Sequence, residues 1–247
     1  MTKKIIIFAS GTKDGGGSGF ENMVNATRNG ILNAEISAVV SNHKNGGVRE
    51  RANRLNIPFI HFPARPPRKL PDSGEFVDKD GNKVDSSKFG TAENYQKLTE
   101  GADLVCLSGW LKLVTGLDPK KTINIHPGPL PRFGGAGMYG HHVHEAVIEA
   151  YKNPSTDSTS SLKSSSGQVA VTHSAVSMHF VTPIYDEGPL FFSQSVPILP
   201  DDTTETLAKR VNEAEHRWQP VITEKVLTGE ISWDGKDPKT LTGQILN

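Results

Sequence analysis

The chain has 247 residues, enough for one large domain or two small ones with a sizeable hydrophobic core. Lys and Arg together number 27, as do Asp and Glu, so the formal net charge is zero. This balance argues against a protein that coats nucleic acid or binds membrane surfaces. The one cysteine, Cys106, can form neither an intrachain disulfide nor a cysteine-based zinc site. No stretch approaches the ~20 apolar residues of a membrane span, and we expect a soluble, cytoplasmic protein.

Short apolar runs that alternate with potential helices organise the first half of the chain. The runs are mostly continuous, which is typical of parallel strands covered on both faces. The segments between them, such as 19–32 and 47–56, can form helices. This alternation predicts an α/β fold with a doubly wound, mostly parallel sheet. The expected strands are residues 4–10, 34–41, 57–62, 102–109 and 122–126.

The second half has a different pattern. Residues 174–182 and 189–198 are strand-like and separated by a turn-rich piece, which predicts two antiparallel strands added to the sheet. Residues 201–227 predict a long amphipathic helix, with Asp202 and Glu205 at the spacing of a capping box. Two segments are expected to be insertions: residues 63–94, rich in Pro, Gly, Asp and Lys, and the Ser/Thr-rich residues 153–168.

A glycine-rich turn, "SGTKDGGGSGF", follows the first expected strand and opens the first helix. Backbone N–H groups and the helix dipole make this a place where anions bind, with Gly17, Ser18 and Gly19 as the candidate residues. The turn matches neither the dinucleotide-binding fingerprint nor the P-loop. Phe20 stands where the fingerprint needs a glycine, and the lysine of a P-loop does not follow the glycines. A turn that needs glycine only for its positive φ angles is the alternative.

Asn124 and His126 end the fifth expected strand and, two residues apart, lie on the same face. Ligands bind at this edge of open α/β sheets, and the prolines that follow stiffen the exit loop. Asp186 lies in a later turn, and a carboxylate close to a histidine favours the imidazolium and orients the ring. A structural histidine and a turn-forming aspartate are the alternatives.

The stretch "GHHVHEAV" invites a metal interpretation, because His141 and His144 are three residues apart. No matching carboxylate or cysteine pattern accompanies them, so no metal site is expected. We instead expect His141 near a helix N-terminus in the cleft.

Taken together, the motifs resemble those of the folate-dependent formyltransferases. The resemblance rests on "NIHPGPLP", on Gly137 to His141, on "MHFVTPIYDEGP" and on the "SG…GSGFENM" turn. It covers about residues 4–62, 94–151 and 170–229. It implies a Rossmann-like fold and a single domain over 1–247, with a phosphate-binding half at about 1–100 and a folate and catalytic half at about 101–230.

The resemblance also implies roles for individual residues. Asn124, His126 and Asp186 match the catalytic residues, and Glu215 matches an acid near the substrate's ribose. Gly17, Ser18 and Gly19 match the loop that binds the substrate phosphate. The matches to the folate pocket are Leu111, Lys112, Leu113, Val114, Asn124 and His179. Three positions depart from the family pattern: Gly19 replaces an asparagine, Ala92 an arginine and Lys112 an arginine.

The implied reaction transfers a formyl group from 10-formyltetrahydrofolate to the primary amine of glycinamide ribonucleotide in purine synthesis. Asn124 would donate a hydrogen bond to the developing oxyanion, and Asp186 would raise the pKa of His126 so that a protonated ring adds charge. The implied partners are small molecules, with no metal, nucleic acid or membrane, in a monomer or homodimer. The alternatives are another acceptor amine (a sugar nucleotide or aminoacyl-tRNA), a formyltetrahydrofolate hydrolase and a non-catalytic nucleotide-binding module.

Overall fold

The computed structural model describes residues 2–12, 15–65, 75, 77, 82, 83, 85–153 and 171–247. The chain divides into two compact units, Met1–Ile123 and Asn124–Asn247. The expected insertion at 63–94 is described only in part, and the one at 153–168 lies outside the described residues apart from Asn153. The expectation of a single domain stays a prediction.

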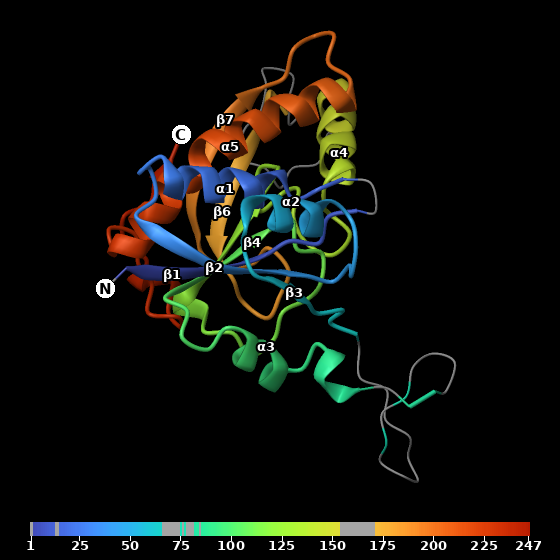
Figure 1. Ribbon diagram of the computed structural model, residues 1–247. Coiled ribbons are helices and arrows are strands. Elements are labelled where there is room, and N and C mark those ends of the chain that lie inside the picture. Colours follow the sequence, from blue (N-terminus) through green and yellow to red (C-terminus); the bar gives the residue numbers. More distant parts are fainter. Residues whose placement is uncertain are drawn as a thin grey trace. The chain divides into compact units, whose positions relative to one another are not determined.

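The first unit is a parallel α/β unit. Its strands are ordered β3-β2-β1-β4 and every pairing between them is parallel, with Ile5 of β1 opposite Ile36 of β2 and Leu104 of β4. Helices α1 and α2 pack side by side (Figure 1). The elements are β1 (Lys3–Phe8), α1 (Ser18–Arg28), β2 (Ala34–Ser41), α2 (Gly47–Leu55), β3 (Phe59–His61), α3 (Ala92–Leu98), β4 (Leu104–Ser108) and the 3₁₀ helices Ser86–Lys88 and Pro119–Lys121.

Burial explains why the strands of the first unit read as continuous apolar runs. Ile5, Ile7 and Phe8 of β1 have no exposed surface, so neighbouring side chains on both faces of the strand are covered. Phe8 also packs against Trp110, with the two ring centroids 5.2 Å apart and the planes nearly perpendicular. The predicted parallel arrangement is confirmed for this unit.

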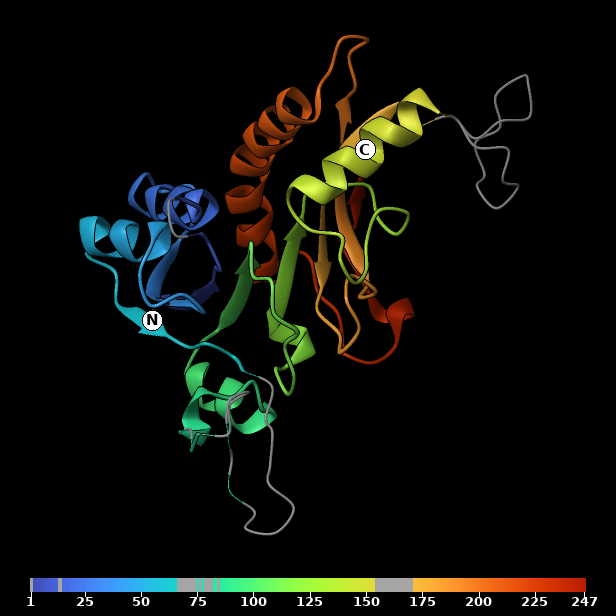
Figure 2. The same ribbon diagram turned by 90° about the vertical axis from the view of Figure 1, so that its right-hand side faces the viewer.

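The second unit carries the antiparallel strands. The order is β5-β6-β7-β8, in which β6 pairs antiparallel with β7, and β8 runs parallel to β7. Helices α4 and α5 pack against each other (Figure 2). The elements are β5 (Thr122–His126), α4 (His141–Lys152), β6 (His173–Phe180), β7 (Leu190–Pro197), α5 (Thr204–Thr228), the 3₁₀ helix Pro238–Thr240 and β8 (Ile245–Leu246).

The predicted fold class, a mostly parallel α/β sheet with antiparallel strands in the C-terminal half, is confirmed. No helix among the described residues is both long enough and apolar enough to cross a membrane.

The predicted capping box of α5 is wrong. Thr203 is the N-cap residue: its side chain accepts a hydrogen bond from the Thr206 amide, and the Thr206 hydroxyl accepts one from the Thr203 amide. The Asp202 carboxylate instead accepts a 2.8 Å hydrogen bond from the Thr206 hydroxyl and two, of 2.7 and 2.8 Å, from Arg210. The side chain of Asp202 is only 3% exposed and that of Arg210 is 26% exposed, so a buried carboxylate pairs with a partly exposed guanidinium at the start of the helix.

Replacing Asp202 by asparagine removes the charge that Arg210 faces and should lower the free energy of unfolding by about 2–4 kcal/mol at pH 7. The hydrogen bonds from Arg210 lower the pKa of Asp202, so its contribution to stability is complete above the carboxylate's ordinary pKa range and is lost progressively as the pH falls from that range toward the lowered pKa. Urea unfolding should therefore show a smaller difference at pH 3 than at pH 7. Glu230→Gln, which breaks the exposed pair with Lys225, is the control and should change little. Equal effects of the two substitutions would contradict this account.

Candidate active site

Asn124 and His126 of β5 come together with Asp186 in the second unit. His126 is 3% exposed, and its Nδ1 lies 3.6 Å from Oδ2 of Asp186. The amide nitrogen of Asn124 lies 3.4 Å from Oδ1 of the same carboxylate. The structure therefore assembles the three residues that the sequence proposed as a catalytic group, although they are up to 62 positions apart.

Asp186 is held by its backbone and by a neighbouring loop. Its φ angle of 55° lies in the left-handed region, which is uncommon for a residue with a side chain. The amide of Gly135 donates a 2.9 Å hydrogen bond to Oδ2. Asp186 thus both forms a turn, which was the alternative role predicted for it, and contacts His126.

The tautomer of His126 is set by a backbone carbonyl. Nε2 lies 2.7 Å from the oxygen of Phe133, and since a carbonyl can only accept, Nε2 carries a proton. Nδ1 is then the atom that can gain or lose a proton, and it faces Asp186. Phe133 could not be predicted from the sequence, because a backbone oxygen is present at every residue type and leaves no motif.

Burial decides the protonation of His126. Loss of solvent lowers the pKa of the ring more than Asp186 and the Phe133 carbonyl raise it, so the net direction is downward. Asp186 acts to raise the pKa of His126, as predicted, but burial outweighs this effect, so the expected protonated ring is replaced by a neutral one at pH 7. For Asp186, burial acts to raise the pKa, but its contacts with His179 and His126 and the hydrogen bond from the Gly135 amide together bring it below its ordinary value.

His179 contacts both Asn124 and Asp186. Its Nδ1 lies 2.8 Å from the Phe180 carbonyl and therefore carries a proton, which leaves Nε2 free to accept from the Asn124 amide at 3.1 Å. The same Nε2 lies 3.4 Å from Asp186. The sequence predicts His179 beside a folate pocket, and in the structure this ring contacts the Asn124 amide.

Gly128 makes room for the His126 ring. A Cβ atom at this position would collide with Val143 of α4 and would lie 3.3 Å from His126 Nε2. The Ser177 hydroxyl donates a 2.7 Å hydrogen bond to the Gly128 carbonyl and holds this segment in place. The glycine within "HPGP" is the sequence signal that could have indicated this close approach.

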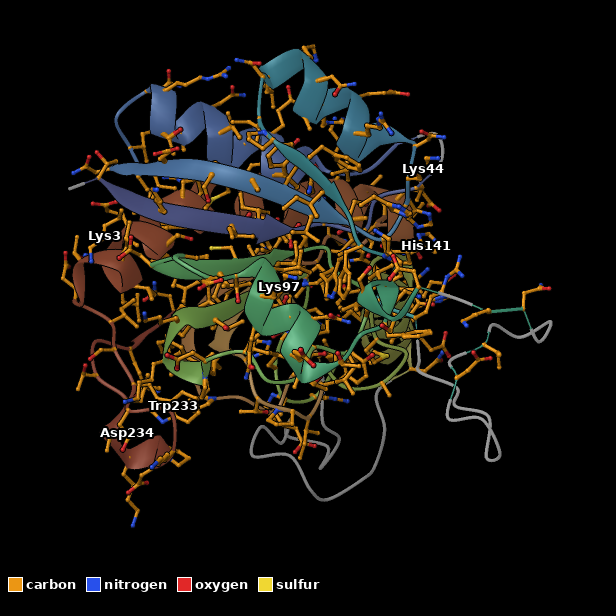
Figure 3. All side chains as sticks on the ribbon, turned by 60° about the horizontal axis from the view of Figure 1, so that its bottom comes forward. Lys3, Lys44, Lys97, His141, Trp233 and Asp234 are labelled. Carbon is orange, nitrogen blue, oxygen red and sulfur yellow. The ribbon has the colours of Figure 1, made fainter. Side chains whose placement is uncertain are left out.

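The other histidines do not gather around a metal position. His141, labelled in Figure 3, begins α4 with a half-exposed side chain, whereas His144 is buried and its pKa is lowered to about 4 by burial. Among the described residues, no three His, Cys, Asp or Glu side chains are arranged to hold a metal ion. The Nδ1 atom of His144 finds no hydrogen-bond partner within the described part of the chain.

The glycine turn opens α1 in the first unit, as predicted. Gly17 is the N-cap residue with a φ of 80°, and Ser18 and Gly19 begin the helix. The first backbone bond of the helix runs from the Glu21 amide to the Gly17 carbonyl. The amides of the residues between them therefore have no partner within the helix.

Residues 111–114, expected to line a folate pocket, follow β4. The Leu111 amide donates to the Ser10 hydroxyl, and the Tyr95 hydroxyl donates to the Leu113 carbonyl at 3.0 Å. The side chains of Leu111 and Leu113 stay 45% and 42% exposed, whereas Val114 is buried. Ala92 begins α3 and packs against Gly116, so the residue that departs from the family pattern is a contact between α3 and this loop.

Glu215 lies on α5 of the second unit and is half-buried. Burial raises the pKa of its carboxyl to about 7, even though the Asn212 amide, at 3.2 Å, acts in the opposite direction. The group therefore changes charge close to neutral pH. Perturbed carboxyl groups of this kind are concentrated at functional sites.

Comparison with known proteins identifies the family. The family model described as formyl transferase matches residues 3–223. The chain is 31% identical to the chloroplastic phosphoribosylglycinamide formyltransferase of Arabidopsis thaliana, over 94% of this chain and 68% of that protein. It is 30% identical to the phosphoribosylglycinamide formyltransferase of Schizosaccharomyces pombe, over 87% of this chain and 93% of the relative.

A solved structure agrees with these relatives. The phosphoribosylglycinamide formyltransferase of Bacillus halodurans superposes with a TM-score of 0.64 at 26% identity, covering 92% of this chain and 96% of that one. The chain belongs to the formyl transferase family.

Because Asp186 opposes the effect of burial on His126, replacing it by asparagine should lower the pKa of His126 further. NMR titration of the imidazole signals measures this: the wild-type midpoint should lie below 6.5 and move down in Asp186→Asn. Glu145→Gln, which removes a carboxylate facing His141 and His142, is the control and should leave His126 unchanged. A wild-type midpoint above 6.5, or an upward shift in Asp186→Asn, would contradict the assignment.

Proposed function

We propose that the chain transfers the formyl group of 10-formyltetrahydrofolate to the primary amine of glycinamide ribonucleotide. The observation that carries the proposal is the grouping of Asn124, His126 and Asp186, a hydrogen-bond donor, a neutral base and an ionised carboxylate in contact. The names of the relatives support the choice of acceptor. In this proposal the folate is a co-substrate and no metal takes part.

The chemistry begins when the amine nitrogen attacks the formyl carbon. A C–N bond forms, the formyl oxygen gains negative charge and the attacking nitrogen becomes positive. Asn124 stabilises the oxygen through one amide proton. The two amide protons of Asn124 point at His179 and Asp186, so one of these hydrogen bonds must break before Asn124 can donate to the formyl oxygen. The bond to Asp186 is the one that breaks, because at 3.4 Å it is the longer of the two.

His126 then removes a proton from the attacking nitrogen. Nδ1 is the accepting atom, since Nε2 already donates to Phe133, and the resulting imidazolium faces the Asp186 carboxylate. The 3.6 Å separation is long for a direct hydrogen bond, so Asp186 stabilises the imidazolium mainly through its charge. A proton is returned to the folate nitrogen as the bond between that nitrogen and the formyl carbon breaks, which leaves a formamide and tetrahydrofolate.

The remaining assignments concern binding. The amides of Gly17, Ser18 and Gly19 would bind the substrate's phosphate, because they have no partner within α1 and lie at its positive end. Leu111, Lys112, Leu113 and Val114 would contact the folate, together with Asn124 and His179. Glu215 would accept hydrogen bonds from the ribose hydroxyls. These roles rest on the family pattern and on the geometry within each unit.

A formyl-transfer assay over a panel of amines tests the function, with release of formate to water as the competing reaction. Glycinamide ribonucleotide should be the preferred acceptor and formate a minor product. Asn124→Ala should lower kcat by about 10²–10³-fold, since it removes one donor to the oxyanion. His126→Ala and Asp186→Asn should also lower kcat. Formate as the main product would favour a hydrolase, and no turnover with any amine or with water would favour a non-catalytic binding module.

The pKa of Glu215 predicts a pH effect on acceptor binding. If the ionised carboxylate accepts from the ribose hydroxyls, the KM for glycinamide ribonucleotide should rise as the pH falls through about 7. Glu215→Gln should raise KM at pH 8 and remove this pH dependence. Glu213→Gln, at an exposed position two residues away on α5, is the control. An unchanged KM profile in Glu215→Gln would exclude the ribose contact.

A further inference from the structure

Three carbonyl groups of the glycine turn, those of Thr12, Gly15 and Gly16, accept hydrogen bonds within the first unit. The Gly47 amide, at the start of α2, donates to the Thr12 carbonyl, and the Thr12 amide donates to the Gly15 carbonyl. The guanidinium of Arg51 donates a 2.8 Å hydrogen bond from Nη1 to the Gly16 carbonyl. Two of these three bonds, to Thr12 and Gly16, come from residues of α2.

Arg51 also ties α1 to α2. Its Nε donates a 2.8 Å hydrogen bond to Oε2 of Glu21, which lies in the first turn of α1. One planar guanidinium thus donates hydrogen bonds both to the turn and to the helix that follows it. The single ammonium group of a lysine cannot reproduce this pair of fixed donors. Arg54 pairs with the other oxygen of Glu21, and among the described residues its side chain donates only there.

The direction of the Gly16 carbonyl determines the direction of the next amide. In a trans peptide the C=O of one residue and the N–H of the next point to opposite sides. With the Gly16 carbonyl fixed on Arg51, the Gly17 amide points away from Arg51. The Ser18 and Gly19 amides follow at the free end of α1, so all three can converge on one anion.

We propose that Arg51 is a positioning residue for the substrate's phosphate: by holding the Gly16 carbonyl, it keeps the Gly17 amide directed at the phosphate. The inference rests on the proposed function, in which Gly17, Ser18 and Gly19 bind that group. Arg51 itself makes no contact with the substrate in this account. It acts through the peptide plane that it fixes.

Gly47 gives a second, independent way to disturb the same element. A Cβ atom there would collide with the Gly15 carbonyl and would lie 2.9 Å from the Gly16 oxygen. The backbone of Gly47 is not in the left-handed region, so an alanine there causes no backbone strain. Gly47→Ala therefore tests only the close packing against the turn. Gly47→Ala should displace the turn while leaving Arg51 and Glu21 intact.

Titration calorimetry with ribose 5-phosphate measures the phosphate site without requiring catalysis. Arg51→Gln, Arg51→Lys and Gly47→Ala should each weaken binding by about tenfold, the loss of one well-placed hydrogen bond to a charged group. Arg54→Gln is the matched control, because it also removes a partner of Glu21 although Arg54 does not contact the turn. The affinity of this variant for ribose 5-phosphate should stay within about twofold of the wild-type value. The KM for glycinamide ribonucleotide should rise in the same variants, while kcat and the KM for the folate stay near wild-type values.

Wild-type affinity for ribose 5-phosphate in both Arg51 variants would overturn the proposal, as would equal weakening by Arg51→Gln and Arg54→Gln. If the Arg51 variants do not fold, undiminished binding by Gly47→Ala would overturn it instead. The titration is separate from the amine-panel assay, so a chain that binds ribose 5-phosphate but formylates no amine would contradict the proposed function and leave this inference standing.

Discussion

The carboxylate of Asp186 meets four groups at once: the rings of His126 and His179, the side-chain amide of Asn124 and the backbone amide of Gly135. Burial alone would favour the neutral acid, yet these contacts lower the pKa and keep the group ionised. The negative charge in turn makes it possible for a buried His126 to accept a proton. The left-handed backbone at Asp186 and the turn around it are the structural cost of presenting one carboxylate to all four partners.

Much of the fold was predictable from the sequence. Continuous apolar runs identified β1, β2, β4 and β5, because strands covered on both faces need apolar side chains at every position. The capping box was predicted wrongly because Asp202 and Thr203 both suit an N-cap. In the structure Thr203 is the N-cap, and the Asp202 carboxylate is bonded to Arg210, eight residues away, and to the Thr206 hydroxyl. Sequence spacing near the helix start carries no information about such a partner.

The site was predictable in its residues but not in its electrostatics. Asn124, His126 and Asp186 were found from motifs, and the structure brings them into contact. The sign of the His126 pKa shift depends on how completely the ring is buried, which a motif does not show. The carbonyls of Phe133 and Phe180, which set both histidine tautomers, are backbone atoms without a residue signature. The link from Arg51 to Gly16 was missed for the same reason.

The central claim is that Asn124 and Asp186 act as one unit through their contacts with each other and with His179. A double-mutant cycle on kcat for formyl transfer tests it most directly, using Asn124→Ala, Asp186→Asn and the double variant. Residues that act as a unit are strongly non-additive, so the double variant should lose no more activity than the more damaging single one. A loss in the double variant equal to the product of the two single losses would contradict the account.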